Sequence, residues 1–152
     1  FPAEMHVSRR LRRTIRQVRF EVRFDTAFEA VIRACAEVER PDEPGTWITP
    51  EMQQAYARLH RLGFARCAEC WQAGRLVGGI YGVHIGRAFF GESMFHTETD
   101  ASKVALVSLV ERLTSEGVEL IDSQVTSAHM LRFGAREIPR DEFLRWVART
   151  TS

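Results

Sequence analysis

Residues 64–95 carry the pattern that most restricts the fold of this chain. Three short runs rich in aromatic and aliphatic residues follow one another with only four residues between them: 64–71, 76–83 and 88–95. Each link contains a glycine, Gly74 in the first and Gly86 in the second. Because short glycine-containing links join neighbouring antiparallel strands, the pattern predicts a three-stranded antiparallel meander.

Helical periodicity flanks the meander on both sides. Apolar residues recur at i, i+3, i+4 and i+7 within 28–35, 52–59 and 106–113. The residues suited to cap these helices are Asp25 or Thr26, Thr49 followed by Pro50, and Asp100. A further strand is expected at 118–125, a short helix at 127–134 and an amphipathic helix at 141–149. This order predicts an α+β fold with a mainly antiparallel twisted sheet and helices on both faces.

Composition agrees with one compact domain over residues 1–152. The chain is 45% hydrophobic and 27% charged, with a net charge of +1, which is enough apolar material for a full core. No run of about 18 uncharged apolar residues occurs, and the first residues lack the pattern of a secretory signal. We therefore expect a cytoplasmic protein that does not associate with membranes.

The cysteines and histidines predict neither a disulfide scaffold nor a metal site. Three cysteines are too few for a scaffold and should be reduced thiols. Cys67 and Cys70 form a CxxC, but no second pair follows to complete a zinc site, and both lie inside a predicted strand. The five histidines show no ligand spacing. We expect structural cysteines and no metal.

The first 24 residues read as a basic arm that leads into the domain. Within residues 1–20, six arginines stand against the single acid Glu4. Such a block favours an anionic partner such as a nucleic acid, or else a solvated terminal tail. Charge alone leaves both alternatives open.

A carboxylate and a carboxamide two residues apart form the most informative polar pattern. If 118–125 is a strand, Asp122 and Gln124 project from the same face, about 6.6 Å apart. They either line a polar groove or form an exposed edge pair. A second acid, Glu92, lies among the aromatic residues of the third meander strand, where it needs a partner or a ligand.

Several segments resemble, in the same order along the chain, the bacterial leucyl/phenylalanyl-tRNA-protein transferases. The matching segments are HVSR at 6–9, GTWIT at 45–49, LVGGIYGV at 76–83, GESMF at 91–95, ASK at 101–103, LIDSQV at 120–125 with His129, and GAREIPR at 134–140. The resemblance covers nearly the whole chain. It implies the GNAT-like acyltransferase fold, in agreement with the order of elements.

The resemblance also implies a function. Members of this family transfer Leu, Phe or Met from aminoacyl-tRNA to the N-terminal α-amine of proteins that begin with Arg or Lys, which marks them for N-end-rule degradation. The implied partners are aminoacyl-tRNA and such acceptor proteins, the implied protein is a monomer, and no cofactor is needed because the aminoacyl ester is already activated. The family's small N-terminal domain has no counterpart here, so we expect a catalytic domain alone.

Matching positions assign residues to three roles. The catalytic residues are Asp122, Gln124 and Glu92, with Glu92 beside the acceptor. The donor side-chain pocket is expected to be lined by Ile80, Phe89, Met94, Leu106, Leu109 and Ile121, and because Phe89 and Met94 have opposite parity on one strand, a β-bulge is expected between them. The tRNA-binding residues are Trp47, stacked on the terminal adenosine, and Arg9, Arg10, Arg12 and Arg13.

The roles within the catalytic pair stay open, and so do two other functions. Gln124 could hydrogen-bond the attacking amine or the developing oxyanion, and Asp122 could act as a base or only orient Gln124. The chain could also be an incomplete, non-catalytic tRNA-binding fragment. A CoA-dependent N-acetyltransferase is disfavoured, because residues 96–102 contain two acids and no glycine where a pyrophosphate loop is expected.

Overall fold

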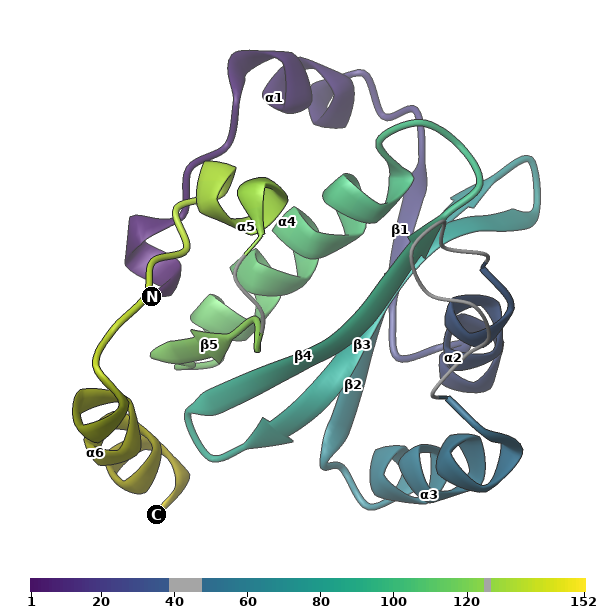
Figure 1. The fold of residues 1–152 in the computed structure, drawn as a ribbon. Coiled ribbons are helices and arrows are strands. Elements are labelled where there is room, and N and C mark those ends of the chain that lie inside the picture. The colour runs from purple at the N-terminus through teal and green to yellow at the C-terminus, as the bar shows by residue number, and fades with distance from the viewer. Residues whose placement is uncertain (39–47, 125–126) are drawn as a thin grey trace.

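The predicted meander forms the centre of a five-stranded sheet in the computed structural model (Figure 1), which describes residues 1–38, 48–124 and 127–152. The strands follow one another in chain order: β1 Glu21–Phe24, β2 Ala65–Gln72, β3 Arg75–Ile85, β4 Ala88–His96 and β5 Leu120–Asp122. The first four strands pair antiparallel, and β5 runs parallel to β4. The prediction of a mainly antiparallel sheet is therefore confirmed.

Helices cover both faces of this sheet, as the sequence predicts (Figure 1). One face carries α1 Arg9–Arg16, α4 Ala101–Ser115 and α5 Ala128–Arg132, and the other carries α2 Phe28–Glu37 and α3 Pro50–Arg61. A short 3-10 helix, Pro2–Glu4, and α6 Arg140–Thr151 complete the described elements. Within the described ranges, no helix is both long enough and apolar enough to cross a membrane.

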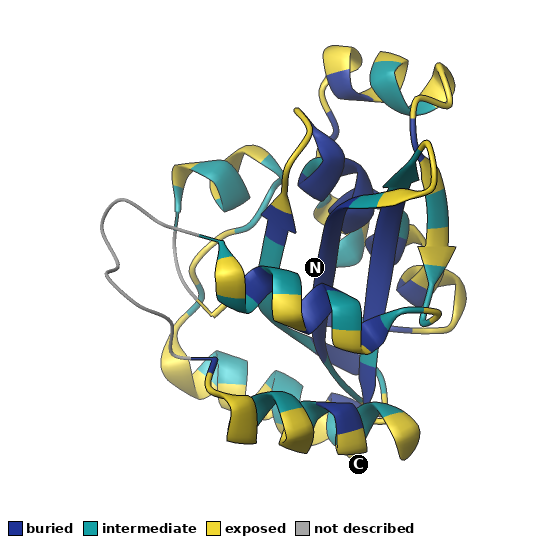
Figure 2. Ribbon diagram, turned by 90° about the vertical axis from the view of Figure 1, so that its right-hand side faces the viewer, coloured by how far each residue is buried: buried dark blue, intermediate teal, exposed yellow. Residues whose placement is uncertain are grey.

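Two hydrophobic cores lie on the two faces of the sheet. The larger packs α4 and α1 against one face, and the smaller packs α2 against the other. Figure 2 shows the central strands buried between these layers. On β3, a Cβ added to Gly78 would lie 2.5 Å from the Cβ of Ala101. Glycine at this position therefore lets the start of α4 lie directly against the sheet.

Residues 1–24, expected as a basic arm that leads into the domain, are folded against it. They contain α1, capped by the Ser8 hydroxyl at 3.2 Å from the Leu11 amide, and the edge strand β1. Val7, Leu11 and Phe20 are buried in the larger core. These apolar residues anchor the segment, although arginines dominate its composition.

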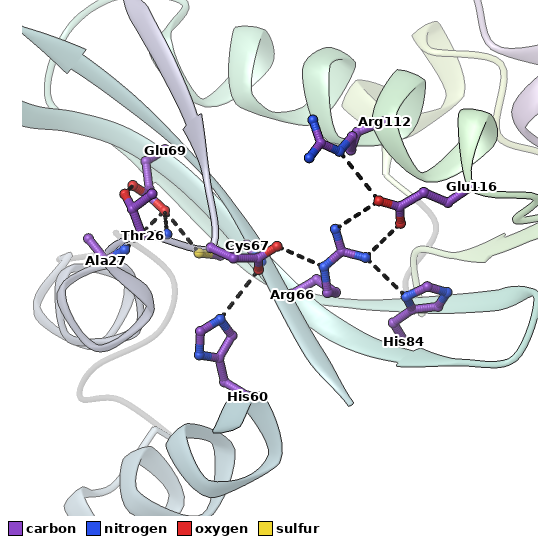
Figure 3. Close-up of polar contacts among 10 residues, drawn as sticks. Thr26, Ala27, His60, Arg66, Cys67, Glu69, His84, Arg112 and Glu116 are labelled. Atoms are coloured by element: carbon purple, nitrogen blue, oxygen red, sulfur yellow. Dashed lines mark hydrogen bonds and ion pairs between the residues drawn. The ribbon is translucent and has the colours of Figure 1, made fainter. Parts of the chain in front are cut away.

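The first predicted helix cap comes from a different part of the chain. Neither Asp25 nor Thr26 caps α2. Instead the buried carboxylate of Glu69, on β2, accepts hydrogen bonds from the backbone amides of Thr26 at 2.8 Å and Ala27 at 3.1 Å (Figure 3). The predicted cap of α3 is confirmed, since the Thr49 hydroxyl accepts from the Met52 amide.

Asp25 lies in a polar network that joins both helical layers to the sheet. Its carboxylate accepts from Arg66 Nε at 2.8 Å and the Cys67 amide at 2.9 Å, and lies 3.4 Å from His60 Nε2. The Arg66 guanidinium also donates a hydrogen bond of 2.7 Å to the Glu116 carboxylate at the end of α4 (Figure 3). Asp25 and Glu116 hold the pKa of Arg66 above its ordinary value, with the Glu116 hydrogen bond as the larger cause.

The cysteines are structural, as predicted. All three are buried and none forms a disulfide. Burial raises the pKa of Cys70 to about 12, and burial followed by the Glu69 charge raises that of Cys67. Neither CxxC thiol is therefore ionised near neutral pH, which excludes a reactive thiolate at this position.

Candidate functional site

The predicted β-bulge occurs in β4, and Glu92 is its extra residue. Tyr81 of β3 pairs with Ser93, whereas the next residue, Gly82, pairs with Gly91. Glu92 thus has no partner position on β3. An extra residue changes the side to which the following side chains point, so Phe89 and Met94 line the same cleft despite their opposite parity.

This cleft lies between β4, β5 and α4 and has a volume of about 820 Å³. All six residues assigned to the donor pocket line it: Ile80, Phe89, Met94, Leu106, Leu109 and Ile121. Glu92 and Asp122 also line it, as do Lys103 and His129. The cleft is therefore mainly apolar, with a small number of polar groups, which is the usual character of a small-molecule site.

Asp122 and Gln124 meet through a turn rather than through the alternation of a strand, so the predicted strand at 118–125 is wrong at its end. The strand β5 stops at Asp122, and Gln124 has a left-handed φ of 65°. The Gln124 amide donates to Asp122 Oδ1 at 2.8 Å. An Asp side chain that binds the amide two residues later stabilises a turn, and this ends the strand. The rest of the predicted strand includes Val125, which lies outside the described residues.

Gln124 connects this turn to the bulge. Its side-chain Nε2 donates to the Gly91 carbonyl oxygen at 2.6 Å, and its side chain lies close enough to Glu92 to affect the pKa of that carboxyl group. Burial is the largest cause that raises the pKa of Glu92, and the charge of Asp122 raises it further, while hydrogen bonds from Gln124 and Tyr56 oppose the shift. The three residues assigned to catalysis are therefore brought together.

Tyr56 is a member of the site that the sequence analysis missed. It lies on α3, and its phenol is close enough to Glu92 for each group to affect the pKa of the other. Burial, and then the Glu92 charge, raises the pKa of Tyr56. Its ring makes an edge contact with Tyr81, with centroids 5.5 Å apart. Helical spacing placed Tyr56 on a core face, and the signal available there was that a half-buried phenol needs a polar partner.

A comparison with protein families identifies the group to which this site belongs. The sequence model of the leucyl/phenylalanyl-tRNA protein transferases matches residues 1–148. The chain belongs to this family. The resemblance seen in the sequence is thereby confirmed.

Curated leucyl/phenylalanyl-tRNA-protein transferases are closely similar to the chain. The protein from Anaeromyxobacter dehalogenans strain 2CP-C is 59% identical over 148 residues, which cover 97% of this chain and 64% of the relative. The protein from Syntrophobacter fumaroxidans is 58% identical over 97% of this chain and 63% of the relative. The chain therefore spans less than two thirds of the length of these relatives.

Solved structures confirm the GNAT-like acyltransferase fold. A predicted acetyltransferase from Clostridium acetobutylicum, solved with acetyl-CoA, has a TM-score of 0.59 at 11% identity and covers 80% of this chain and 92% of its own. A Trypanosoma brucei acetyltransferase has a TM-score of 0.55 at 14% identity and covers 80% and 95%. At these identities the likeness concerns the fold alone.

In the connection from β4 to α4, the Ala101 amide donates to the Glu98 carbonyl oxygen at 3.2 Å, and Asp100 occupies the position before α4. The predicted capping bond from Asp100 is not formed, because its carboxylate binds Arg10 and Lys103 instead. In the described part of the chain, no group of three His, Cys, Asp or Glu residues could hold a metal ion.

The residues assigned to tRNA binding fall into three cases in this family member. Arg9, Arg12 and Arg13 are exposed on α1. Arg10 differs from them, because its guanidinium forms a two-point ion pair with Asp100 at 3.0 and 3.2 Å. Trp47 lies outside the described residues.

Proposed function

We propose that this chain is the catalytic domain of an aminoacyltransferase. It moves Leu, Phe or Met from aminoacyl-tRNA to the N-terminal α-amine of proteins that begin with Arg or Lys. The observation that carries the proposal is a mainly apolar cleft whose lining includes the carboxylates of Glu92 and Asp122, in a chain that belongs to this family. The cleft suits the donor side chain, and the carboxylates suit a cationic acceptor.

The cleft favours apolar donors over polar ones. Residues such as Leu106, Leu109 and Ile121 offer no hydrogen bond to a donor side chain. A polar side chain buried against them without a partner would cost on the order of 1–3 kcal/mol. Leu, Phe and Met have no such group, so they share the pocket.

The two carboxylates favour an acceptor that begins with Arg or Lys. Glu92 and Asp122 are close enough for the charge of Asp122 to raise the pKa of Glu92. A guanidinium or ammonium group placed between them would relieve this repulsion and form charge-assisted hydrogen bonds. The acceptor side chain thereby holds its own α-amine beside the catalytic pair.

The hydrogen bonds of Gln124 indicate how it acts. Its Nε2 donates to the Gly91 carbonyl oxygen at 2.6 Å, and this bond fixes the side-chain amide beside β4. Its Oε1 can then accept an N–H from the attacking α-amine. Asp122 holds the Gln124 backbone through the 2.8 Å bond, so it orients Gln124 and offsets positive charge on the nitrogen. Gln124 thus contributes an acceptor for the amine.

The reaction balances without a cofactor. The neutral α-amine forms a bond to the ester carbonyl carbon, and the carbon–oxygen bond to the ribose of the tRNA breaks. The proton lost by the nitrogen ends on the ribose hydroxyl. The energy comes from the ester, and the protein positions the amine about 3 Å from the carbonyl carbon. We propose that the protein acts as a monomer in the cytoplasm and marks its acceptors for N-end-rule degradation.

The proposal is tested by offering the chain two donors with one acceptor. The donors are leucyl-tRNA and acetyl-CoA, the acceptor is a peptide that begins with Arg, and the product is identified by mass spectrometry. We expect the mass of one leucine residue to be added from leucyl-tRNA and no acetyl group from acetyl-CoA. Binding of leucyl-tRNA without transfer would instead support an incomplete tRNA-binding fragment, and acetyl transfer would support an acetyltransferase.

A further inference from the structure

A second hollow lies beside the cleft, between α1, α4 and α5, which share one face of the sheet (Figure 1). Its volume is about 210 Å³, and its polar lining is His6, Ser8, Arg10, Lys103, His129 and Arg132. We call it the cationic pocket. None of its lining residues is acidic.

The charge of the cationic pocket is only partly neutralised. Asp100 pairs with Arg10 at 3.0 Å and with Lys103 at 3.5 Å. The Asp100 side chain is only 4% exposed, so the two cations cover it and present positive charge to the solvent. Arg132 has no ion pair among the residues that the structure describes. Three cations against one covered acid leave the pocket net positive.

His129, which lines the cationic pocket, has a lowered pKa, and this is consistent with the net positive charge there. Burial is the largest cause that lowers the pKa of His129, and the charges of Lys103, Arg132 and His96 lower it further. A neutral imidazole still offers one N–H donor. The Ser8 hydroxyl accepts from the Leu11 amide at 3.2 Å, so its own proton stays available to donate. The pocket thus combines cations with neutral donors, which suits a phosphate better than a carboxylate of the protein.

The cationic pocket is continuous with the apolar cleft. Lys103 and His129 line both, and so they form the border between them. When the amino acid of the donor fills the cleft, the ribose and adenine of the terminal nucleotide connect it to the rest of the tRNA outside the cleft. The next anionic group along the donor is the phosphate on the 5′ side of that adenosine, one nucleotide away from the ester.

From this placement we infer that the cationic pocket binds the phosphodiester phosphate next to the terminal adenosine of the donor, with Arg132, Arg10 and Lys103 as its cationic ligands. The inference rests on the proposed function, because it takes the cleft as the donor site. The role of the cationic pocket differs from that of Arg9, Arg12 and Arg13 on the exposed side of α1. The pocket fixes the reacting end of the donor, whereas those arginines do not line it.

The test compares two stable analogues that differ by one phosphate. The ligand is leucyl-adenosine with an amide in place of the ester, with or without a 5′-phosphate, and the dissociation constant of each is measured by calorimetry with the complete chain. We expect the phosphate to tighten binding at least about tenfold, because charge-assisted hydrogen bonds are among the strong ones. The ratio of the two constants isolates the phosphate from any effect of a variant on the cleft.

Single substitutions show which residues are responsible for the tighter binding of the phosphorylated analogue. Arg132→Ala, at an exposed position, and Lys103→Ala should each bring the ratio closer to one, and Arg132→Lys should restore part of it. The matched control is Arg33→Ala, an exposed arginine on α2 across the sheet, which should leave the ratio unchanged. Thermal melting of each variant checks its fold, and the exposed Arg132 keeps the test valid if Lys103→Ala does not fold.

The possible results distinguish a failure of the phosphate site from a failure of the donor site. Equal binding of the two analogues by the unchanged chain would overturn the phosphate site and leave the donor cleft in place. An equal loss of the ratio in Arg33→Ala would overturn it too, because general electrostatic attraction would then explain the effect. If neither analogue binds, the donor site of the proposed function is wrong, and the phosphate site falls with it.

Discussion

Gln124 and Gly91 are joined by a hydrogen bond of 2.6 Å from the Gln124 side-chain nitrogen to the Gly91 carbonyl oxygen. The bond links the turn after β5 to the residue before the bulge of β4. The bulge determines the direction of the Glu92 side chain, and the turn places Gln124 beside Glu92. The polar part of the site therefore depends on two irregularities of backbone structure, one in each of two neighbouring strands.

Replacement of Gln124 by Ala should lower aminoacyl transfer by about 10²-fold or more, the scale seen when a positioned polar group is lost from a catalytic site. The fold should remain, because Gln124 is exposed. Single-turnover transfer from leucyl-tRNA and thermal melting measure the two effects. Gln54→Ala, an exposed glutamine on α3, serves as the control. Transfer near the unchanged rate in Gln124→Ala would refute the assignment.

Glu92→Gln should separate stability from activity. The pKa of Glu92 is raised above its ordinary 4.5, chiefly by burial, so the folded state holds this proton more tightly than the unfolded state. Its contribution therefore favours folding at low pH and is lost as pH rises from 4.5 through the folded pKa. The variant should be relatively more stable than the unchanged chain at about pH 7 than at about pH 4.

The same variant should transfer leucine less well to peptides that begin with Arg or Lys, because it lacks the negative charge that holds them. Urea unfolding at both pH values and transfer assays measure these effects. A variant that is destabilised equally at both pH values would show that the carboxyl group is not strained by burial. Unchanged transfer would remove Glu92 from the acceptor site.

Met94→Trp should change donor preference. Met94 lines the cleft, and a close-packed pocket that already holds an extra ring has less room for a Phe side chain than for Leu. We expect kcat/KM to fall more for phenylalanyl-tRNA than for leucyl-tRNA. If Met94 is only a core residue, the larger side chain should instead cost about 1–3 kcal/mol of stability and leave the ratio of the two donors unchanged. Thermal melting together with that ratio distinguishes the two results.

The exposed arginines of α1 should act through salt-dependent contacts. Changing Arg9, Arg12 and Arg13 together to Ala should weaken tRNA binding and reduce the dependence of log K on log salt by roughly 0.7–0.9 for each lost phosphate contact. Arg10 should behave differently, because its ion pair with Asp100 also ties α1 to the start of α4. Arg10→Ala should therefore lower the melting temperature as well. An unchanged salt slope in the triple variant would show that these arginines are only solvated.

Local patterns predicted much of the fold. The meander and the helices follow from periodicity within single elements. The bulge was expected from the family resemblance, which assigns both Phe89 and Met94 to one pocket. The cap of α2 could not be predicted in this way, because Glu69 lies 42 residues after Ala27. Little in the sequence indicated that residues 1–24 pack into the core, because buried Leu11 and Phe20 are few beside the many arginines.

The sequence indicated which of these residues lie together but not how they are arranged. Asp122 and Gln124 are neighbours, as the spacing indicates, but an Asp side chain competes with the strand for backbone hydrogen bonds, and here it forms a turn. Tyr56 reaches Glu92 from α3 on the opposite face of the sheet, and such a contact depends on tertiary packing that no local period reports.

In the proposed reaction, the amino acid is added to the α-amine of the acceptor's first residue. This is tested by transfer of leucine from leucyl-tRNA to a peptide that begins with Arg and contains an internal Lys, with the site of addition located by tandem mass spectrometry. We expect leucine on the α-amine of the first Arg alone, and no product when that amine is acetylated. Leucine on the Lys side chain, or equal addition to the acetylated peptide, would refute the proposed function.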